Sequence, residues 1–388
     1  MRRESPRRPS GFAPLPGRSR LGPAVLSSAR GREGPNRPHQ VSARPEGTLV
    51  DPIPGGREPR QQPLLDVRNL SVAFHDGETW GEVLTDVSFA IEPGEFVGIV
   101  GESGCGKSLT ALSILGLLPP RGVRLGGAML FDGRDLAKLS ERARREVRGR
   151  RISMVFQEPM SALDPVFTVG TQLLETVRTH FKVGRREALE RAVEALAAVG
   201  IASPRQAAAM YPSSLSGGMR QRAMIAMALV CEPRLLIADE PTTALDVTIQ
   251  AQIMDLLIEL GQRTGTAILF ITHNLALVAE SCRRMLTMYA GQIVEDGPVR
   301  EILARPRHPY TAGLLGSIPQ SSRRKSVLPS IPGRVPSLHE MPPGCRFAPR
   351  CAHVEPPCLV PQQLVSGRDW RKVRCRRAGE LALPGAQS

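Results

Sequence analysis

The chain contains 388 residues, of which 41% are hydrophobic and 23% charged, and it carries a formal net charge of +14. This length allows one large domain with an appendage or two ordinary domains, and the composition is typical of a globular protein. Taken alone, the charge would indicate a nucleic acid or an anionic membrane as partner. No apolar run approaches the roughly 18 residues that cross a bilayer, and no secretory signal is visible. We therefore expect a cytosolic chain that reaches a membrane only through a partner.

The positive charge is concentrated at the two ends of the chain. Residues 1–62 have a net charge of +7 and residues 304–388 one of +10, whereas residues 63–303 have a net charge of −3. The central part is therefore slightly acidic and does not indicate a nucleic-acid-binding body. Arg, Pro and Gly make up half of residues 1–62, so we expect this segment to be disordered, as a basic arm or as a solvated tail.

Residues 63–303 alternate between the apolar period of strands and that of helices. We predict strands at residues 65–71, 87–91, 96–100, 235–238 and 267–272, and helices at 107–118, 185–199 and 249–262. This alternation predicts a parallel sheet with helices on its faces. After about residue 306 the periodicity fades and Pro, Arg and Cys become frequent, so we expect a small irregular appendage there.

A phosphate-binding motif lies between the predicted strand 96–100 and the predicted helix 107–118. Residues 101–108 match G-x-x-x-x-G-K-[ST], a loop whose backbone N–H groups and helix N-terminus bind phosphate. Lys107 would reach the β- and γ-phosphates, and Ser108 would ligate Mg²⁺. Cys105 is either a redox-sensitive thiol or, as we favour, a small residue that fits the turn. The nucleotide-binding residues expected here are Gly101, Ser103, Gly104, Cys105, Gly106, Lys107, Ser108 and Leu109.

Two acidic residues follow the apolar run 235–238, at the end of a predicted buried strand. Asp239 would hold Mg²⁺, and Glu240 would polarise an attacking water as a general base. Paired acids also cap strands and helices in many folds. In combination with the phosphate loop, however, this pair is strong evidence for a nucleotide site. A phosphate loop alone admits kinases, GTPases, helicases and transport ATPases.

A second anion-binding helix N-terminus is predicted at residues 215–222, which read Leu-Ser-Gly-Gly-Met-Arg-Gln-Arg. Ser216, Gly217 and Gly218 would supply it. Two such sites facing one nucleotide within one chain would be redundant, so we expect the second to cap a nucleotide held by a partner chain. In isolation the same residues would be a linker before a helix.

These motifs, in this order, resemble the ATP-binding subunits of ABC transporters over residues 64–320. The resemblance implies that residues 101–108 are the Walker A loop, Asp239 and Glu240 the Walker B pair, and residues 215–219 the ABC signature. Met219 stands where Gln is common in that family, which puts a contact by that side chain in doubt.

Further residues take roles from the same resemblance. Gln157 resembles the Q-loop glutamine, which touches Mg²⁺ or the lytic water and couples to the membrane subunit. Asp246, in Ala-Leu-Asp, resembles the D-loop aspartate, and His273 the switch histidine that contacts the γ-phosphate. Phe74 has the expected place of the aromatic that stacks on adenine, with Trp80 as the alternative.

The implied fold is an α/β P-loop NTPase ABC cassette with a parallel-sheet core, an antiparallel β part and a helical subdomain at about residues 160–232. A small irregular Cys-rich C-terminal appendage follows it. We divide the chain into segment 1–62, an ABC domain at 63–303 and a C-terminal region at 304–388. Two subunits would hold two ATP molecules head to tail, and closure of this dimer would move two membrane permease subunits at the cytoplasmic face of the membrane.

Residues 307–311 and 160–165 further resemble the oligopeptide/dipeptide permease ATPases. So do Cys345, Cys351, Cys358 and Cys375, whose counterparts in that subfamily hold an iron–sulfur cluster. Four thiolates ligate a [4Fe–4S] cluster or a structural zinc, and free cysteines are the third alternative. The neighbouring Arg346, Arg350 and Arg374 would offset the charge of a cluster or be solvated.

We therefore expect an ATPase that requires ATP and Mg²⁺ and energises peptide uptake. Its expected partners are the permeases, a paralogous second ATPase and, indirectly, an extracytoplasmic solute-binding protein, with no nucleic acid. The alternatives are an importer ATPase for nickel or another small solute, and a soluble ABC ATPase that acts on nucleic acid or ribosomes. A scaffold that binds ATP without hydrolysis is disfavoured because Glu240 and His273 are both present.

Overall fold

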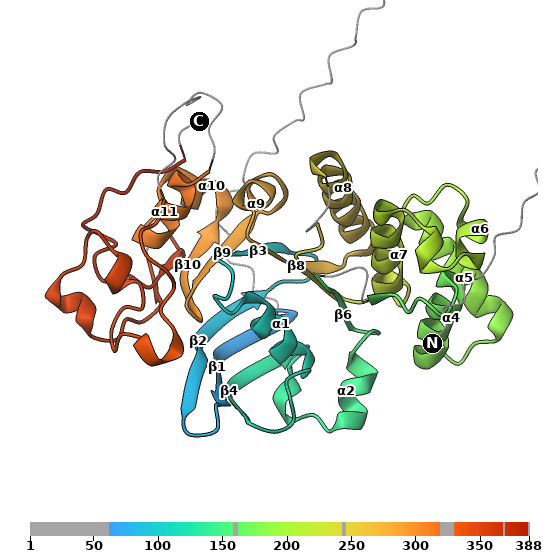
Figure 1. Ribbon diagram of the computed structural model, residues 1–388, viewed down its shortest axis with the longest axis horizontal. Coiled ribbons are helices and arrows are strands. Elements are labelled where there is room, and N and C mark those ends of the chain that lie inside the picture. Colours follow the sequence, from blue (N-terminus) through green and yellow to red (C-terminus); the bar gives the residue numbers. More distant parts are fainter. Residues whose placement is uncertain (1–61, 158–161, 243–245, 319–329, 368, 387–388) are drawn as a thin grey trace, which may run out of the picture. The chain divides into compact units, whose positions relative to one another are not determined.

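The computed structural model describes residues 62–157, 162–242, 246–318, 330–367 and 369–386 (Figure 1). The expectation of disorder for residues 1–62 therefore falls almost wholly outside the described residues, as do residues 160 and 161 and the first two residues of the predicted D-loop, 244 and 245. No helix in the described ranges is both long and apolar enough to cross a bilayer.

A four-stranded antiparallel sheet forms one part of the molecule. Its strands, in spatial order, are β2 (Trp80–Ile91), β1 (Leu65–His75), β4 (Val123–Phe131) and β5 (Arg134–Asp135). The predicted strands 65–71 and 87–91 lie within β1 and β2 but are too short. The pairing of β1 with β2 continues beyond register shifts between Val67 and Ala73, which interrupt the alternating pattern that sequence reading depends on.

An eight-stranded sheet forms the centre of the molecule. In spatial order its strands are β11 (Val365–Ser366), β12 (Lys372–Val373), β10 (Gln292–Pro298), β9 (Arg284–Tyr289), β3 (Phe96–Val100), β8 (Ala267–Thr272), β7 (Leu235–Asp239) and β6 (Ile152–Val155). The strands from β9 to β6 are mutually parallel. Every residue of β7 and β8 is buried, as expected for strands covered on both faces. The predicted parallel sheet is confirmed.

Helices cover both faces of the parallel strands. Helix α1 (Lys107–Leu115) packs in the hydrophobic core shared by the two sheets. The opposite face is covered by α7 (Gly217–Leu229), α8 (Val247–Thr264), α9 (Leu275–Ser281) and α10 (Val299–Ala304). Between β5 and β7 the described residues also form α2 (Glu141–Val147), α4 (Val169–His180), α5 (Arg185–Ala198) and α6 (Pro204–Ala209). The last three lie with α7 beyond the β6 edge (Figure 1).

Helix α1 ends earlier than predicted, and for a different reason. The prediction ended it at residue 118, before two prolines. In the structure Gly116 adopts a left-handed conformation with φ 61°, and its N–H bonds the carbonyl oxygens of Leu112 and Ser113. Glycine takes this conformation at low cost, so it caps the helix before the prolines are reached.

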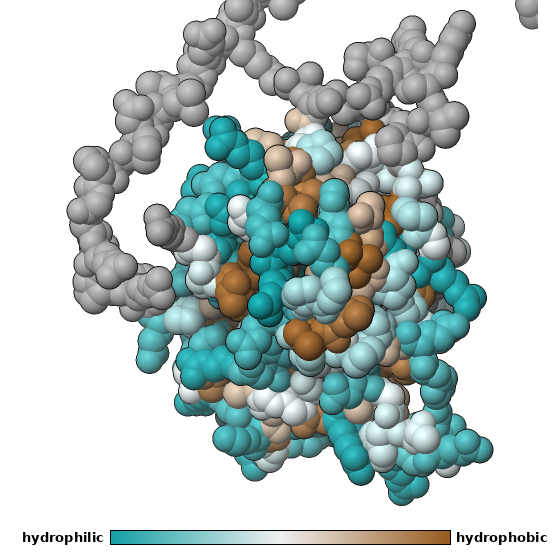
Figure 2. Space-filling model, turned by 90° about the vertical axis from the view of Figure 1, so that its left-hand side faces the viewer, coloured by the Kyte–Doolittle hydropathy of each residue, from teal (hydrophilic) through white to brown (hydrophobic). Residues whose placement is uncertain are grey.

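The C-terminal region packs directly against the central sheet. Helix α11 (Pro309–Gly316) is followed by an irregular chain with short 3-10 turns, and strand β12 then pairs with β10. Figure 2 views this side of the molecule, where the surface is mainly hydrophilic with small apolar patches between. Arg371 anchors the region, because its Nη2 lies 2.7 Å from Oε1 of Glu295 and both side chains are buried.

This buried ion pair leads to a prediction about stability. Burial raises the pKa of Glu295, and Arg371 is among the groups that oppose this rise. A carboxyl with a raised folded-state pKa binds its proton more tightly in the folded chain than in the unfolded chain. Its contribution to stability therefore falls as pH rises from the unfolded-state pKa to the folded-state pKa. We expect Arg371→Met to raise this pKa further and to lower the free energy of unfolding by about 3–5 kcal/mol at neutral pH, and by less at mildly acidic pH.

Urea unfolding at two pH values measures both effects. The control is Arg205→Met, which removes an exposed ion pair with Glu190 and should produce a small change at either pH. Equal losses for the two variants, or a loss for Arg371→Met that is independent of pH, would contradict this account.

Candidate functional site

The residues predicted to act on the nucleotide follow directly after four neighbouring parallel strands. The phosphate loop begins at Gly101, after β3, and His273 follows β8. Asp239 is the last residue of β7 and Glu240 comes next, while Gln157 comes shortly after β6. The carboxyl ends of parallel strands meet at one edge of a sheet, which is where α/β proteins bind ligands. The fold therefore brings these five positions to the same edge.

The phosphate loop is shaped by glycines and folded around Lys107. Gly104 and Gly106 have φ values of 77° and 106°, which other residues rarely adopt. Lys107 is buried, and its Nζ donates to the carbonyl oxygens of Gly101, at 2.8 Å, and Glu102, at 3.1 Å. The ammonium group therefore lies inside the curve of the loop, as binding to phosphate oxygens would require.

The other loop residues differ in exposure. Ser103 and Gly104 are exposed, whereas Leu109 is half-buried against the core shared by the two sheets. Cys105 is buried, and this burial raises the pKa of its thiol. A buried, protonated thiol is a poor nucleophile, which favours the interpretation of Cys105 as a small residue that fits the turn.

Asp239 carries a buried oxygen suited to a cation. The residue is 4% exposed, and burial raises the pKa of its carboxyl although Ser108 hydrogen-bonds to it. Its Oδ1 has no hydrogen-bond partner among the described residues. Mg²⁺ prefers such carboxylate and hydroxyl oxygens, so Asp239 and Ser108 fit the expected metal.

The carboxylate of Glu240 lies between the other two predicted catalytic side chains. Nε2 of Gln157 donates to Oε2 at 3.2 Å, and Nδ1 of His273 lies 3.2 Å from Oε1. Glu240 has a φ of 46° and donates its N–H to the carbonyl oxygen of Ile271 in β8. The residue is thus fixed in an uncommon backbone conformation, which is frequent at functional sites.

The signature residues begin α7, which packs beside β6. Oγ of Ser216 accepts the N–H of Met219 at 3.3 Å, and Gly217 and Gly218 form the first turn. Asp246 caps α8 in the same way, since its Oδ1 accepts the N–H of Ile249 at 3.0 Å. Helix α7 packs beside β6, three strands from β3, and a Cβ at Gly218 would lie 3.7 Å from Cγ2 of Ile249 in the first turn of α8.

The two candidate adenine-stacking aromatics have different surroundings. Phe74 is half-buried and packs against the core shared by the two sheets. Trp80 is exposed and has the guanidinium of Arg124 at 3.8 Å from its ring centroid. One face of the indole is therefore already covered, which favours Phe74 as the residue available to a base.

The four C-terminal cysteines line one cavity. Cys345, Cys351, Cys358 and Cys375 all border it, and burial raises the pKa of the Cys375 thiol to about 11. Within the described residues, however, no three His, Cys, Asp or Glu side chains have the arrangement of a metal site. The composition of the cavity suits a cluster, whereas its present geometry does not ligate one.

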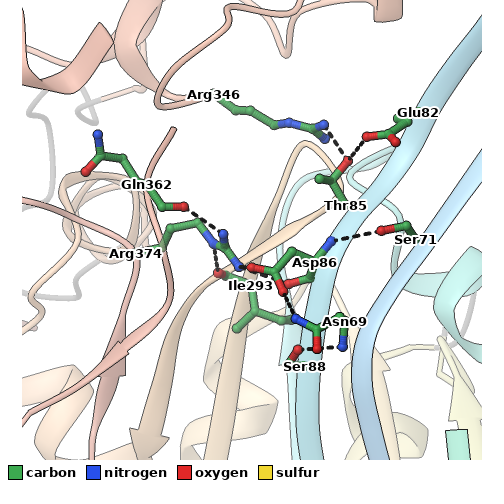
Figure 3. Close-up of polar contacts among 10 residues, drawn as sticks. All are labelled: Asn69, Ser71, Glu82, Thr85, Asp86, Ser88, Ile293, Arg346, Gln362 and Arg374. Carbon is green, nitrogen blue, oxygen red and sulfur yellow. Dashed lines mark hydrogen bonds and ion pairs between the residues drawn. The ribbon is translucent and has the colours of Figure 1, made fainter. Parts of the chain in front are cut away.

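The arginines beside these cysteines are buried and not solvated. Arg346, Arg350 and Arg374 are buried and bind groups of the ATP-binding body. Arg374 donates to Oδ2 of Asp86 at 3.0 Å and to the carbonyl oxygen of Ile293, while Arg346 donates to Oγ1 of Thr85 at 2.7 Å (Figure 3). The expectation that these side chains are solvated was wrong, because their partners lie far away in sequence; that they offset the charge of a cluster stays a prediction.

Sequence reading also missed the environment of Glu102 in the phosphate loop. Arg350 forms a two-pronged ion pair with its carboxylate, and the hydroxyl of Tyr310 accepts its N–H. The sequence offered two signals for this contact: Arg350 directly precedes Cys351, and Tyr310 belongs to the His-Pro-Tyr motif. Neither indicates a partner more than 200 residues earlier.

A glycine-rich phosphate loop, an acid pair after a parallel strand, and a carboxylate held by a glutamine and a histidine define a P-loop ATPase of the ATP-binding cassette class. Comparisons agree. The family described as ABC transporter matches residues 84–243, and that described as oligopeptide/dipeptide transporter, C-terminal region, matches residues 294–358.

Individual relatives are similar over most of the chain. A probable peptide ABC transporter ATP-binding protein of Sinorhizobium fredii is 57% identical over 326 residues, which cover 83% of this chain and 97% of the relative. A dimeric ATP-binding cassette in a post-hydrolysis state with ADP and Pi aligns with a TM-score of 0.55 and 28% identity over 61% of this chain and 99% of that one. The cbiO1 protein of Clostridium perfringens also aligns with a TM-score of 0.55 and 28% identity, over 63% of this chain and 92% of that one.

The chain belongs to the family of ABC transporter ATP-binding proteins. It is an ATPase with the ABC cassette fold, and ATP and Mg²⁺ are its substrate and metal.

The first glycine of the loop provides a geometric prediction. A Cβ at Gly101 would overlap the carbonyl oxygen of Met288 and lie 2.7 Å from Sγ of Cys105. The loop must therefore shift, and we expect Gly101→Ala to weaken ATP binding by about tenfold or more, since overpacking costs ~1–3 kcal/mol. A fluorescent ATP analogue measures this affinity. Gly184→Ala is the control, because its Cβ would have no atom within 4 Å; equal affinities of the two variants would contradict the prediction.

Proposed function

We propose that this chain is the ATP-hydrolysing subunit of an importer that takes up dipeptides or oligopeptides through separate membrane permease subunits. The observation that carries the catalytic part is the position of Glu240, with Gln157 and His273 on its two carboxylate oxygens. The transport part is supported by the match of residues 294–358 to the oligopeptide/dipeptide transporter C-terminal region and by the peptide-transport name of the relative.

The residues divide into binding and catalytic groups in this proposal. Backbone N–H groups of residues 101–109 and the Lys107 ammonium bind the phosphates, and Phe74 stacks on adenine. Mg²⁺ would be held by Ser108, Asp239 and Gln157, and it would neutralise charge on the phosphates. Glu240 takes the proton of the attacking water, while Gln157 and His273 orient its carboxylate.

We further propose that two such subunits act as a head-to-tail dimer. Ser216, Gly217 and Gly218 begin α7, which packs beside β6, three strands from β3, after which the phosphate loop begins. This helix start therefore suits a phosphate of a nucleotide held by the partner, with Asp246 at the same interface. The dimeric assembly of the similar cassette supports this arrangement. The proposed partner is a paralogue, and the dimer docks on two permeases at the cytoplasmic face of the plasma membrane. These permeases receive solute from an extracytoplasmic binding protein.

The proposed division into segments is 1–62, an ABC domain at 63–303 with its helical subdomain at about 160–232, and a C-terminal region at 304–388. Helix α10 ends at Ala304 and α11 begins at Pro309, so the proposed boundary falls at the last residue of α10, directly before the connection between the two helices. The C-terminal family match, which begins at residue 294, overlaps the end of the ABC domain in this division.

A substitution at Glu240 tests the catalytic proposal. We expect Glu240→Gln, assayed with the partner subunits, to lower ATP turnover by about 10²- to 10⁴-fold, the usual contribution of a general base. ATP affinity should remain, and peptide uptake should stop. Lys107→Ala is the comparison and should lose ATP binding itself. ATP turnover near the wild-type rate in Glu240→Gln would contradict the role of Glu240, and uptake of nickel but not of peptides would contradict the proposed solute.

We also propose that Cys345, Cys351, Cys358 and Cys375 bind a [4Fe–4S] cluster. All four border one cavity, and binding requires that their thiols move closer together and release protons.

Purification without oxygen tests this proposal. We expect brown protein with broad visible absorption, which Cys351→Ser removes and which Cys282→Ser, at a buried cysteine elsewhere, leaves unchanged. Colourless protein that contains one zinc, or no metal, would contradict the cluster.

A further inference from the structure

The second residue of the phosphate loop is held by the C-terminal region. Nη1 of Arg350 lies 2.7 Å from Oε2 of Glu102, and Nη2 lies 3.0 Å from Oε1, so the pair is bidentate. The Tyr310 hydroxyl accepts the backbone N–H of Glu102 at 2.9 Å. Both the side chain and the backbone of Glu102 are therefore held by residues that follow the cassette in sequence.

Arg350 is itself held rigidly. Its side chain is 5% exposed, its Nε donates to the carbonyl oxygen of Pro332 at 2.8 Å, and its guanidinium lies 5.7 Å from the ring centroid of Tyr289. The ring of Tyr289 packs on Tyr310 with a centroid distance of 4.6 Å, and Phe347 contacts both rings. This aromatic cluster fixes the two groups that hold Glu102.

The position of Glu102 makes this restraint relevant to phosphate binding. The carbonyl oxygens of Gly101 and Glu102 are the acceptors for Lys107 Nζ, so a shift of Glu102 moves the lysine. A carboxylate in a loop that receives a triphosphate also repels it, and the effect is strong at short range. A bidentate arginine neutralises this charge and fixes its direction.

We propose that Arg350 is a positioning residue for the phosphate loop: it neutralises Glu102 and, with Tyr310, holds the loop backbone in the form that binds ATP. The proposal rests on the proposed phosphate-binding role of residues 101–109. In this proposal the C-terminal region stabilises the ATP-binding form of the phosphate loop, in addition to the proposed binding of a cluster by its cysteines.

The other two arginines of this region provide a matched control. Arg374 and Arg346 are buried to a similar extent and also join the region to the cassette. Arg374 binds Asp86 and the carbonyl oxygen of Ile293, and Arg346 binds Thr85 (Figure 3) and the carbonyl oxygen of Ala290. Neither touches residues 101–108 in the contacts of the described chain. Loss of Arg374 therefore loosens the region without releasing Glu102.

The experiment compares full-chain variants by their dissociation constant for a fluorescent ATP analogue, by kcat and KM with the partner subunits present, and by melting temperature. We expect Arg350→Met to raise the dissociation constant and KM by about tenfold or more, the effect of losing a hydrogen-bonded charge pair, with a smaller change in kcat. Arg350→Lys should restore part of the affinity. Glu102→Gln in the Arg350→Met background should also restore part of it, because the uncompensated carboxylate is gone.

Arg374→Met is expected to lower the melting temperature as much as Arg350→Met while it keeps ATP affinity within about twofold of wild type, a difference of under ~0.5 kcal/mol. Wild-type affinity in Arg350→Met, or an equal loss of affinity in both variants, would overturn the proposal. If Arg350→Met does not fold, three variants replace it: Arg350→Lys, Glu102→Arg, and the double exchange of Glu102→Arg with Arg350→Glu. The double exchange should bind ATP more tightly than Glu102→Arg alone. An affinity no better than that of Glu102→Arg would overturn the proposal.

Lys107→Ala separates this inference from the proposed function. If that variant binds ATP normally, residues 101–109 are not the ATP site and both fail. If it loses binding while Arg350→Met keeps wild-type affinity, only the inference about Arg350 fails.

Discussion

The parallel alignment of β6, β7, β8 and β3 is the constraint on which the rest of the structure depends. Because the four strands run in the same direction, their carboxyl ends meet at one edge of the sheet. Hydrogen bonding between neighbouring strands sets the spacing of the groups that follow them. The phosphate loop, the acid pair, the histidine and the glutamine therefore face a common site although nearly 175 residues separate the first from the last.

The distribution of charge acquires a structural meaning from the C-terminal region. Residues 304–388 have a net charge of +10 and residues 63–303 one of −3, and ion pairs join the two segments. Buried arginines of the C-terminal region pair with acids of the cassette: Arg350 with Glu102, Arg371 with Glu295 and Arg374 with Asp86. These arginines are thus paired inside the molecule, while the net charge of the chain, which already counts the paired acids, stays at +14.

Local patterns predicted the elements whose cause is local. The apolar runs of β3, β7 and β8 were located closely, because strands buried on both faces leave continuous apolar sequence. The ends of β1 and α1 were misplaced, since one is decided by register shifts against a neighbouring strand and the other by a glycine that turns left-handed. The small strand β12 was missed, because two residues carry no periodic pattern and its pairing with β10 decides its existence.

The sequence by itself determined the chemistry of the site: the glycines and Lys107 have the spacing of a phosphate loop, and Asp239 and Glu240 follow an apolar strand, so together they indicate nucleotide hydrolysis. The tertiary structure decided which groups touch. It placed Gln157 and His273 on opposite oxygens of Glu240, and it brought Arg350 to Glu102. The physical reason is that hydrogen bonds and ion pairs act over a few ångströms in space, whereas sequence patterns report only neighbours along one helix or strand.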